Sequence, residues 1–152
     1  MNTDWRSRAG RMGLVLLGLV FFASAVAAEP EMRLSPKKIR DEVRTVVQAQ
    51  LGALQAGDFA TAYEYAAAGL RRLYDERLFA AMIRRGYAPL LKPNQADLGV
   101  VRDDGENTAQ VSVTVTDHAN HSTLYRYWLV KEADVWRISG VVLEQKPPRG
   151  DT

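Results

Sequence analysis

The spacing of apolar residues changes once along this chain, and that change limits the folds open to it. Between residues 36 and 86 apolar side chains recur every three or four residues, which is the period of amphipathic helices. From Ala96 onwards the period is two, so that Ala109, Val111, Val113 and Val115 alternate with polar residues, as in a half-buried strand. A chain with helices first and strands afterwards is typical of an α+β fold, with the helices on one face of an antiparallel sheet.

Three helices are expected in the first part. Residues 36–56 carry the longest apolar stripe, and Gly57 ends that helix. Asp58 and Asp75 are suited to accept hydrogen bonds from the first backbone N–H groups of a second and a third helix. Gly86 is expected to end the third helix in a left-handed conformation.

About four strands are expected in the second part, joined by short polar turns. The strand at residues 121–131 is apolar on both faces, with Tyr125 and Tyr127 on one and Trp128 on the other. We therefore expect this strand to be central, with one face covered by the helices and the other by a partner.

The first 28 residues predict a secretion signal. Three arginines precede an apolar run at residues 14–28, which ends in small residues with an Ala-x-Ala pattern. The run is shorter than the ~20 residues that a membrane-spanning helix needs. We expect cleavage after Ala27 or Ala28 and export, into a bacterial periplasm. The alternative is that this segment is retained as a tilted N-terminal membrane anchor.

Cleavage would leave a neutral protein with no cysteine. It removes three of the 20 basic and one of the 18 acidic residues, which leaves 17 of each. A neutral domain lacks the positive charge that nucleic-acid binding requires. The absence of cysteine excludes disulfides, a thiolate nucleophile and cysteine-ligated metals. Residues 29–35 are interpreted as a flexible lead-in, 36–146 as one domain and 147–152 as a disordered tail.

Two segments resemble a known family: Phe79-Ala-Ala-Met-Ile-Arg-Arg-Gly-Tyr-Ala-Pro89 and Trp136-Arg-Ile-Ser-Gly140. They are similar to signatures of domain-of-unknown-function family 4864, grouped with the nuclear-transport-factor-like (SnoaL-like or cystatin-like) proteins. The resemblance spans about Pro36 to Gln145. It implies a cone of three N-terminal helices on a curved antiparallel sheet of about four strands, and it implies no reaction. In cone folds the outer sheet face often packs on a second copy, so we expect a homodimer through this face.

The number of aromatic residues is high for a small domain, and aromatic walls with a few hydroxyls suit a pocket for a small molecule. The alternative is that these side chains build the core and a dimer interface. At the cavity mouth we expect a small apolar or aromatic ligand to contact Tyr63, Tyr87, Asp117 and Tyr127.

Asp117, His118 and His121 form the one cluster that contains both histidines, and this composition could serve a zinc ion or acid–base chemistry. The cluster falls in an expected turn, where such residues are common for backbone reasons. We therefore predict no metal, no cofactor and no catalysis, and interpret the chain as an exported small-molecule-binding or protein-interaction module. The alternatives are a structural subunit with a filled pocket, or an isomerase- or hydrolase-type enzyme that uses Asp117 or His118 as acid or base.

Overall fold

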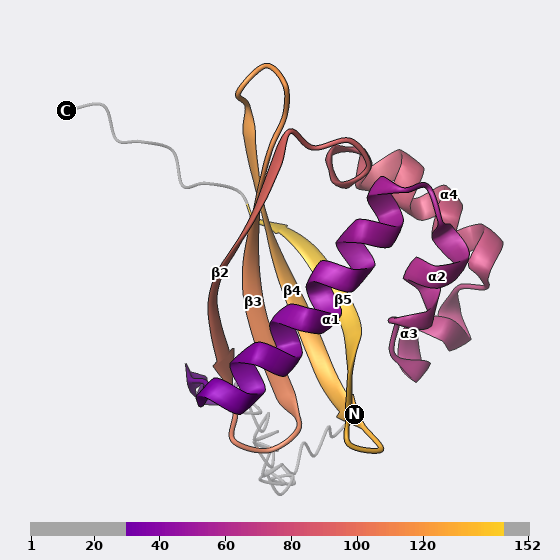
Figure 1. The fold of residues 1–152 in the computed structure, drawn as a ribbon. Coiled ribbons are helices and arrows are strands. Elements are labelled where there is room, and N and C mark those ends of the chain that lie inside the picture. The colour runs from indigo at the N-terminus through magenta and orange to yellow at the C-terminus, as the bar shows by residue number, and fades with distance from the viewer. Residues whose placement is uncertain (1–29, 145–152) are drawn as a thin grey trace, which may run out of the picture.

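The computed structural model describes residues 30–144, in which helices pack against a five-stranded antiparallel sheet (Figure 1). The elements in chain order are β1 (Arg33–Leu34), α1 (Lys37–Gln55), α2 (Phe59–Glu64), α3 (Ala68–Leu73), α4 (Glu76–Gly86), the 3-10 helix η1 (Ala88–Leu90), β2 (Gln95–Asp103), β3 (Thr108–Thr116), β4 (Ser122–Glu132) and β5 (Val135–Glu144). The expected secretion signal and C-terminal tail lie outside the described residues. None of the helices in residues 30–144 combines the length and the apolar composition that crossing a membrane requires.

The sheet has five strands and not four, in the order β1-β2-β3-β4-β5. The additional strand, β1, lies in the segment interpreted as a flexible lead-in, where Arg33 and Leu34 pair with Asp103 and Arg102 of β2. Two residues show no alternation that a sequence pattern could reveal. They form a strand because β2 supplies hydrogen-bond partners for their backbone.

The strand that was expected to be central, β4, is an interior strand of the sheet and pairs with β3 on one side and β5 on the other. Alternate residues of both strands are buried on the face towards the helices, and Val113 of β3 lies opposite Tyr125 of β4. On the outer face Trp128 is half-buried. The interior strand β4 therefore presents apolar side chains on its outer face as well as on the face that the helices cover.

Helix α1 lies across the inner face of the sheet (Figure 1), and its apolar stripe, which includes Val43, Val47 and Leu54, is buried there. The Trp136 indole Nε1 donates a 3.1 Å hydrogen bond to Glu42 Oε2, which ties β5 to this helix. Gly57 ends the helical segment with a φ of 71°, in the left-handed region that glycine favours.

The helices after Gly57 differ partly from the expectation. The side chains of Asp58 and Asp75 cap α2 and α4 as predicted, accepting from the backbone N–H of Thr61 and of Leu78. Between them lies α3, which was not expected. Gly86 is the last residue of α4 but lacks the predicted positive φ, which among described glycines occurs at Gly57 and Gly105.

Helix α3 forms because other elements hold its ends. The backbone N–H of Ala68 donates a 3.0 Å hydrogen bond to the Glu132 carboxylate at the end of β4. At the other end the Tyr63 hydroxyl donates to the carbonyl oxygen of Tyr74 at 2.6 Å. The helix is thereby fastened over one end of the sheet, although no residue within it is fully buried.

Candidate ligand-binding cavity

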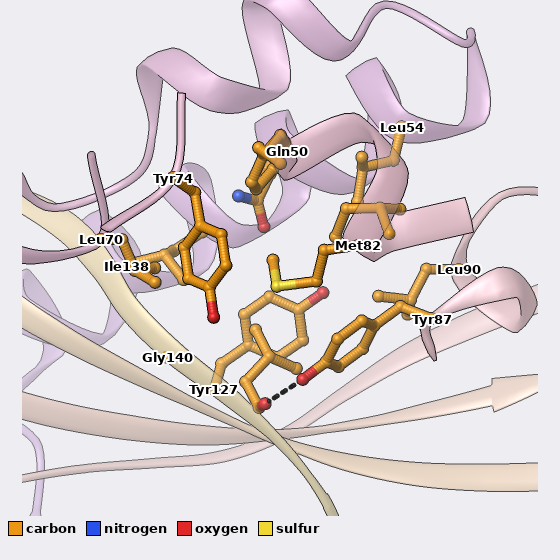
Figure 2. Close-up of a pocket in the computed structure, with 13 residues that line it drawn as sticks. Gln50, Leu54, Leu70, Tyr74, Met82, Tyr87, Leu90, Tyr127, Ile138 and Gly140 are labelled. Atoms are coloured by element: carbon orange, nitrogen blue, oxygen red, sulfur yellow. Dashed lines mark hydrogen bonds between the residues drawn. The ribbon is translucent and has the colours of Figure 1, made fainter. Parts of the chain in front are cut away.

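A cavity of about 180 Å³ lies between the helices and the inner face of the sheet (Figure 2). Its walls come from α1, α3, α4, η1, β4 and β5. The lining residues are Gln50, Leu54, Leu70, Tyr74, Phe79, Met82, Ile83, Tyr87, Leu90, Tyr127, Ile138, Gly140 and Val141. None of the thirteen carries a formal charge, and the polar groups among their side chains are three phenol hydroxyls and one amide. The cavity is therefore a neutral, mainly apolar site.

Tyr127 was expected at the site, and the structure places it in the cavity wall. Its side chain lies on the same face of β4 as that of Tyr125, because residues two apart in a strand share a face. This is the face that the helices cover. The side chain is 0% exposed, and its hydroxyl has no hydrogen-bond partner. Burial raises the pKa of this phenol, and the neighbouring Tyr125 and Tyr87 raise it further. The hydroxyl therefore keeps its proton at physiological pH.

Tyr87 was also expected, and it lines the cavity at the end of α4. Its hydroxyl donates a 2.8 Å hydrogen bond to the carbonyl oxygen of Val141 on β5. Its ring centre lies 5.9 Å from that of Tyr125, at a tilt of 37°. Because its proton is already bonded, Tyr87 contributes mainly its aromatic ring to the site.

Tyr63 lies behind the cavity wall and not in it. Its ring centre is 5.4 Å from that of Phe79, which does line the cavity. Its hydroxyl donates to the carbonyl oxygen of Tyr74, another lining residue. Tyr63 therefore acts as a support that fixes the positions of two wall residues.

Gln50 is a lining residue that the sequence interpretation missed. It is a buried polar residue of α1, and its amide Nε2 donates to the Ala62 carbonyl oxygen at 3.3 Å. Figure 2 shows its amide oxygen directed into the cavity. The signal was present in the sequence, because Gln50 falls on the stripe of Val43, Val47 and Leu54 at helical spacing.

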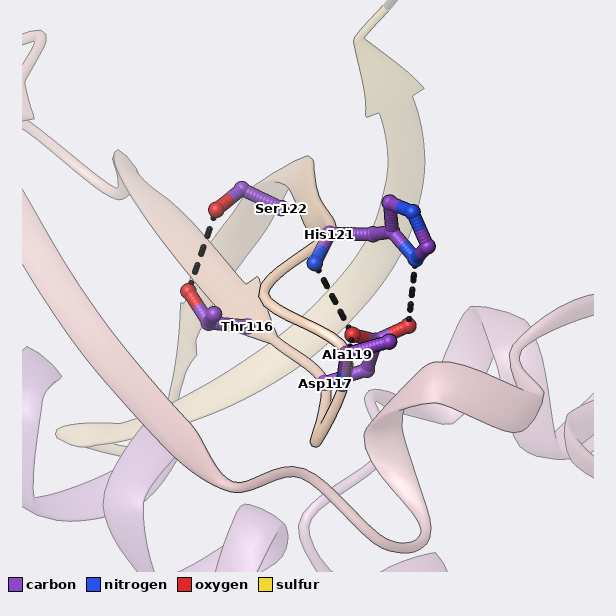
Figure 3. Close-up of polar contacts among 5 residues, drawn as sticks. All are labelled: Thr116, Asp117, Ala119, His121 and Ser122. Atoms are coloured by element: carbon purple, nitrogen blue, oxygen red, sulfur yellow. Dashed lines mark hydrogen bonds and ion pairs between the residues drawn. The ribbon is translucent and has the colours of Figure 1, made fainter.

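Asp117 lies in the turn between β3 and β4, outside the cavity lining (Figure 3). Its carboxylate accepts hydrogen bonds from the backbone N–H groups of Ala119, at 2.8 Å, and His121, at 2.9 Å. The His121 ring Nδ1 lies 3.2 Å from the second carboxylate oxygen. The His121 backbone N–H, above all, holds the Asp117 pKa below its usual 3.8.

These hydrogen bonds stabilise the turn. His118 is exposed, and Asp117 is half-exposed in a carboxylate–backbone network of its own turn. Within residues 30–144, no three His, Cys, Asp or Glu residues gather closely enough to hold a metal ion. The four ligand contacts expected from sequence therefore separate into two in the cavity wall (Tyr87 and Tyr127), one behind it and one in a distant turn.

Comparison with known proteins identifies a family that matches the chain and solved structures that are similar to it. A family described as a domain of unknown function (DUF4864) matches residues 37–150. The solution structure of RPA3114, a SEC-C motif containing protein from Rhodopseudomonas palustris, is similar with a TM-score of 0.50 at 14% identity. This similarity covers 66% of this chain and 77% of that one.

A second similar structure is that of Aln2 from a Streptomyces species, with a TM-score of 0.46 and 18% identity, covering 74% of this chain and 94% of that one. No curated protein matches the chain. At these identities the likeness concerns the fold alone.

Proposed function

The chain belongs to the DUF4864 family, whose description assigns no activity, and we therefore propose a function from its cavity: a non-catalytic module that binds a small, neutral, largely apolar molecule. The observation that carries this proposal is the cavity itself, a space between the helices and the sheet that is lined in part by aromatic side chains. Its 180 Å³ is slightly more than the roughly 150 Å³ of an engineered apolar cavity that binds benzene. The occupant would therefore have about the size of one ring.

The neutral lining supports binding without catalysis. Acid–base and nucleophilic mechanisms need an ionisable or activated group next to the reacting atoms. The hydroxyl of Tyr127 is held in its protonated form, and that of Tyr87 is bonded to Val141. Neither has a base beside it in the lining.

We further propose that the module is exported, into a bacterial periplasm, and has the cone-shaped, nuclear-transport-factor-like form of the α+β fold. Export is supported by the arginines, apolar run and Ala-x-Ala pattern that precede residue 29. The cone is supported by α1 lying across the sheet while α2, α3 and α4 gather beside it on the β5 side (Figure 1). Mass spectrometry of the protein purified from a periplasmic extract tests export, since cleavage after Ala27 or Ala28 removes a defined mass.

A second proposal concerns the outer face of the sheet, which we infer to be where a second copy binds. Gln110 lies on this face in the middle strand, and its Oε1 is buried without a donor. Val100 and Val142 are exposed on the same face. A two-fold axis near Gln110 would let the two amides satisfy each other while the valines become buried.

The oligomeric state tests this second proposal. Val142→Glu should convert a dimer to a monomer in light scattering, because it places a charge in the interface. Leu143→Glu is the matched control, since Leu143 is equally exposed, at 53%, but points to the opposite face of β5. A monomeric wild-type protein, or equal effects of both variants, would contradict a dimer through this face.

Ligand-observed NMR with neutral one-ring compounds tests binding in the cavity. Leu70→Trp should abolish binding, because the indole would fill the cavity from α3. Leu73→Trp is the control, since Leu73 lies on the same helix, is 73% exposed and is outside the lining. Unchanged binding in Leu70→Trp would place the compounds elsewhere. The enzyme alternative would instead require an activity that Asp117→Asn or His118→Ala abolishes without loss of stability.

A further inference from the structure

One fully buried polar group in the cavity wall has no hydrogen-bond partner among the described residues. Among residues 30–144, four buried side-chain polar atoms have no hydrogen-bond partner: Ser35 Oγ, Asp103 Oδ2, Gln110 Oε1 and the Tyr127 hydroxyl oxygen. Tyr127 alone of these residues lines the cavity. A buried polar group without a partner destabilises the folded protein, so its retention needs a reason.

The reason lies in what the cavity offers to an occupant. The Tyr87 hydroxyl proton is bonded to the Val141 carbonyl oxygen, and the Gln50 Nε2 is bonded to that of Ala62. The Tyr127 hydroxyl therefore remains available as a donor deep in the wall, and the hydroxyl of the half-buried Tyr74 is a second unbonded phenol of the lining. A buried neutral phenol is a good donor and a weaker acceptor, which favours an occupant with an acceptor oxygen.

The occupant can reach this hydroxyl through a small side-chain movement. Tyr127 is fully shielded from solvent, and Met82 points into the cavity beside it (Figure 2). Methionine is unbranched and has three rotatable bonds, so it can change rotamer at low cost. Met82 thus provides an adaptable wall that can move aside for a ligand.

The lining also excludes charged ligands. A carboxylate or ammonium group loses its hydration on entry, and this loss opposes binding unless an opposite charge or several hydrogen bonds replace the water. No lining residue carries such a charge. The ligand must therefore be neutral, with its polar group limited to what the Tyr127 and Tyr74 hydroxyls and the Gln50 amide can satisfy.

We propose that the cavity binds a neutral one-ring molecule whose carbonyl oxygen accepts a hydrogen bond from the Tyr127 hydroxyl. This inference rests on the proposed binding function and adds the chemical class of the ligand. Tyr127 is then the specificity-determining residue, and the aromatic and aliphatic walls supply the remaining affinity. Benzoate, toluene and acetophenone are matched probes, because they combine the same ring with a charge, no oxygen and a carbonyl oxygen, respectively.

The experiment measures the Kd of each probe by NMR titration of the full chain expressed with its N-terminal segment. The wild-type protein should bind acetophenone about three- to tenfold more tightly than toluene, the ratio that one neutral hydrogen bond provides. Benzoate should bind at least about tenfold more weakly than acetophenone. Tyr127→Phe should bind acetophenone and toluene equally. Tyr125→Phe is the control, since Tyr125 lies on the same face of β4 but outside the lining, and it should keep the wild-type ratio.

The outcomes separate this inference from the proposed function. If toluene and acetophenone bind equally to the wild-type protein, or if Tyr127→Phe keeps the preference, the cavity binds ligands but the Tyr127 assignment is wrong. If benzoate binds most tightly, the neutral-ligand class is wrong. If no probe binds while Leu70→Trp and the wild-type protein behave alike, the binding function itself fails.

Discussion

The Tyr87 hydroxyl donates a 2.8 Å hydrogen bond to the carbonyl oxygen of Val141, and this bond joins the end of α4 to β5 beside the cavity. The two residues are 54 positions apart in the chain. The bond closes one side of the cavity, because it fixes a lining ring from the helical layer against a lining strand. Stability and ligand access should both depend on it.

Tyr87→Phe should lower the free energy of unfolding by about 1 kcal/mol, because it removes the hydrogen bond from the Tyr87 hydroxyl to the Val141 carbonyl oxygen. Urea denaturation measures this change. Tyr74→Phe is the control, since the Tyr74 side chain lines the same cavity and its hydroxyl has no bond to the described residues. Equal losses in both variants would mean that the hydroxyl–carbonyl bond contributes nothing.

Tyr127→Phe should have the opposite effect on the free energy of unfolding in the absence of ligand. The variant removes a buried hydroxyl that lacks a partner and keeps the ring, so the free energy of unfolding should rise by about 1 kcal/mol. The same urea experiment measures it. A loss of stability of that size would show that the hydroxyl has a partner, such as a bound water, in the free protein.

The Asp117 turn should make stability depend on pH. Since the backbone N–H of His121, above all, lowers the folded-state pKa, the ionised carboxylate is favoured in the folded protein. Its contribution is complete well above the usual pKa of 3.8 and is lost as the pH falls through the lower, folded-state pKa. The urea midpoint of Asp117→Ala should therefore lie below that of the wild-type protein near neutral pH, with the difference shrinking in acid.

Glu106→Ala is the control for this measurement, because Glu106 is an exposed carboxylate in the turn between β2 and β3. Its midpoint should follow that of the wild-type protein as the pH falls. Ligand binding should be unchanged in Asp117→Ala, because the turn lies outside the cavity lining. A loss of binding in this variant would show that Asp117 contributes to the binding site.

Leu54→Ala should enlarge the cavity from the α1 side. Leu54 is buried and lines the cavity, so the change should cost about 2–5 kcal/mol of stability. It should also admit a two-ring probe such as naphthalene, measured by NMR titration. Val43→Ala is the control on the same helix, since it is buried outside the lining and should lose stability without admitting the larger probe.

Local interactions made several features predictable from the sequence. Asp58 and Asp75 cap helices because each carboxylate bonds a backbone N–H only three residues away. The inward positions of Tyr125 and Tyr127 follow from the two-residue period of a strand. Such features need no knowledge of the rest of the fold.

Asp117 shows where alternation along a strand does not predict the position of a side chain. It continues the alternation of β3, which predicts an inward side chain, but its carboxylate bonds the backbone of its own turn. The local bonds prevail because a charged carboxylate is satisfied there at the surface, whereas the neutral cavity offers it no charged partner.

The amino-acid sequence by itself determined the α+β class, the starts of α2 and α4, the inward face of the strands and two of the cavity tyrosines, because short-range periodicity and capping decide them. Only the tertiary structure decided the presence of β1 and α3 and the place of the cavity. Strand β1 and helix α3 exist because distant elements satisfy their backbone groups. The cavity forms where Gln50, Met82 and Tyr127, far apart in the chain, meet without filling the space between them.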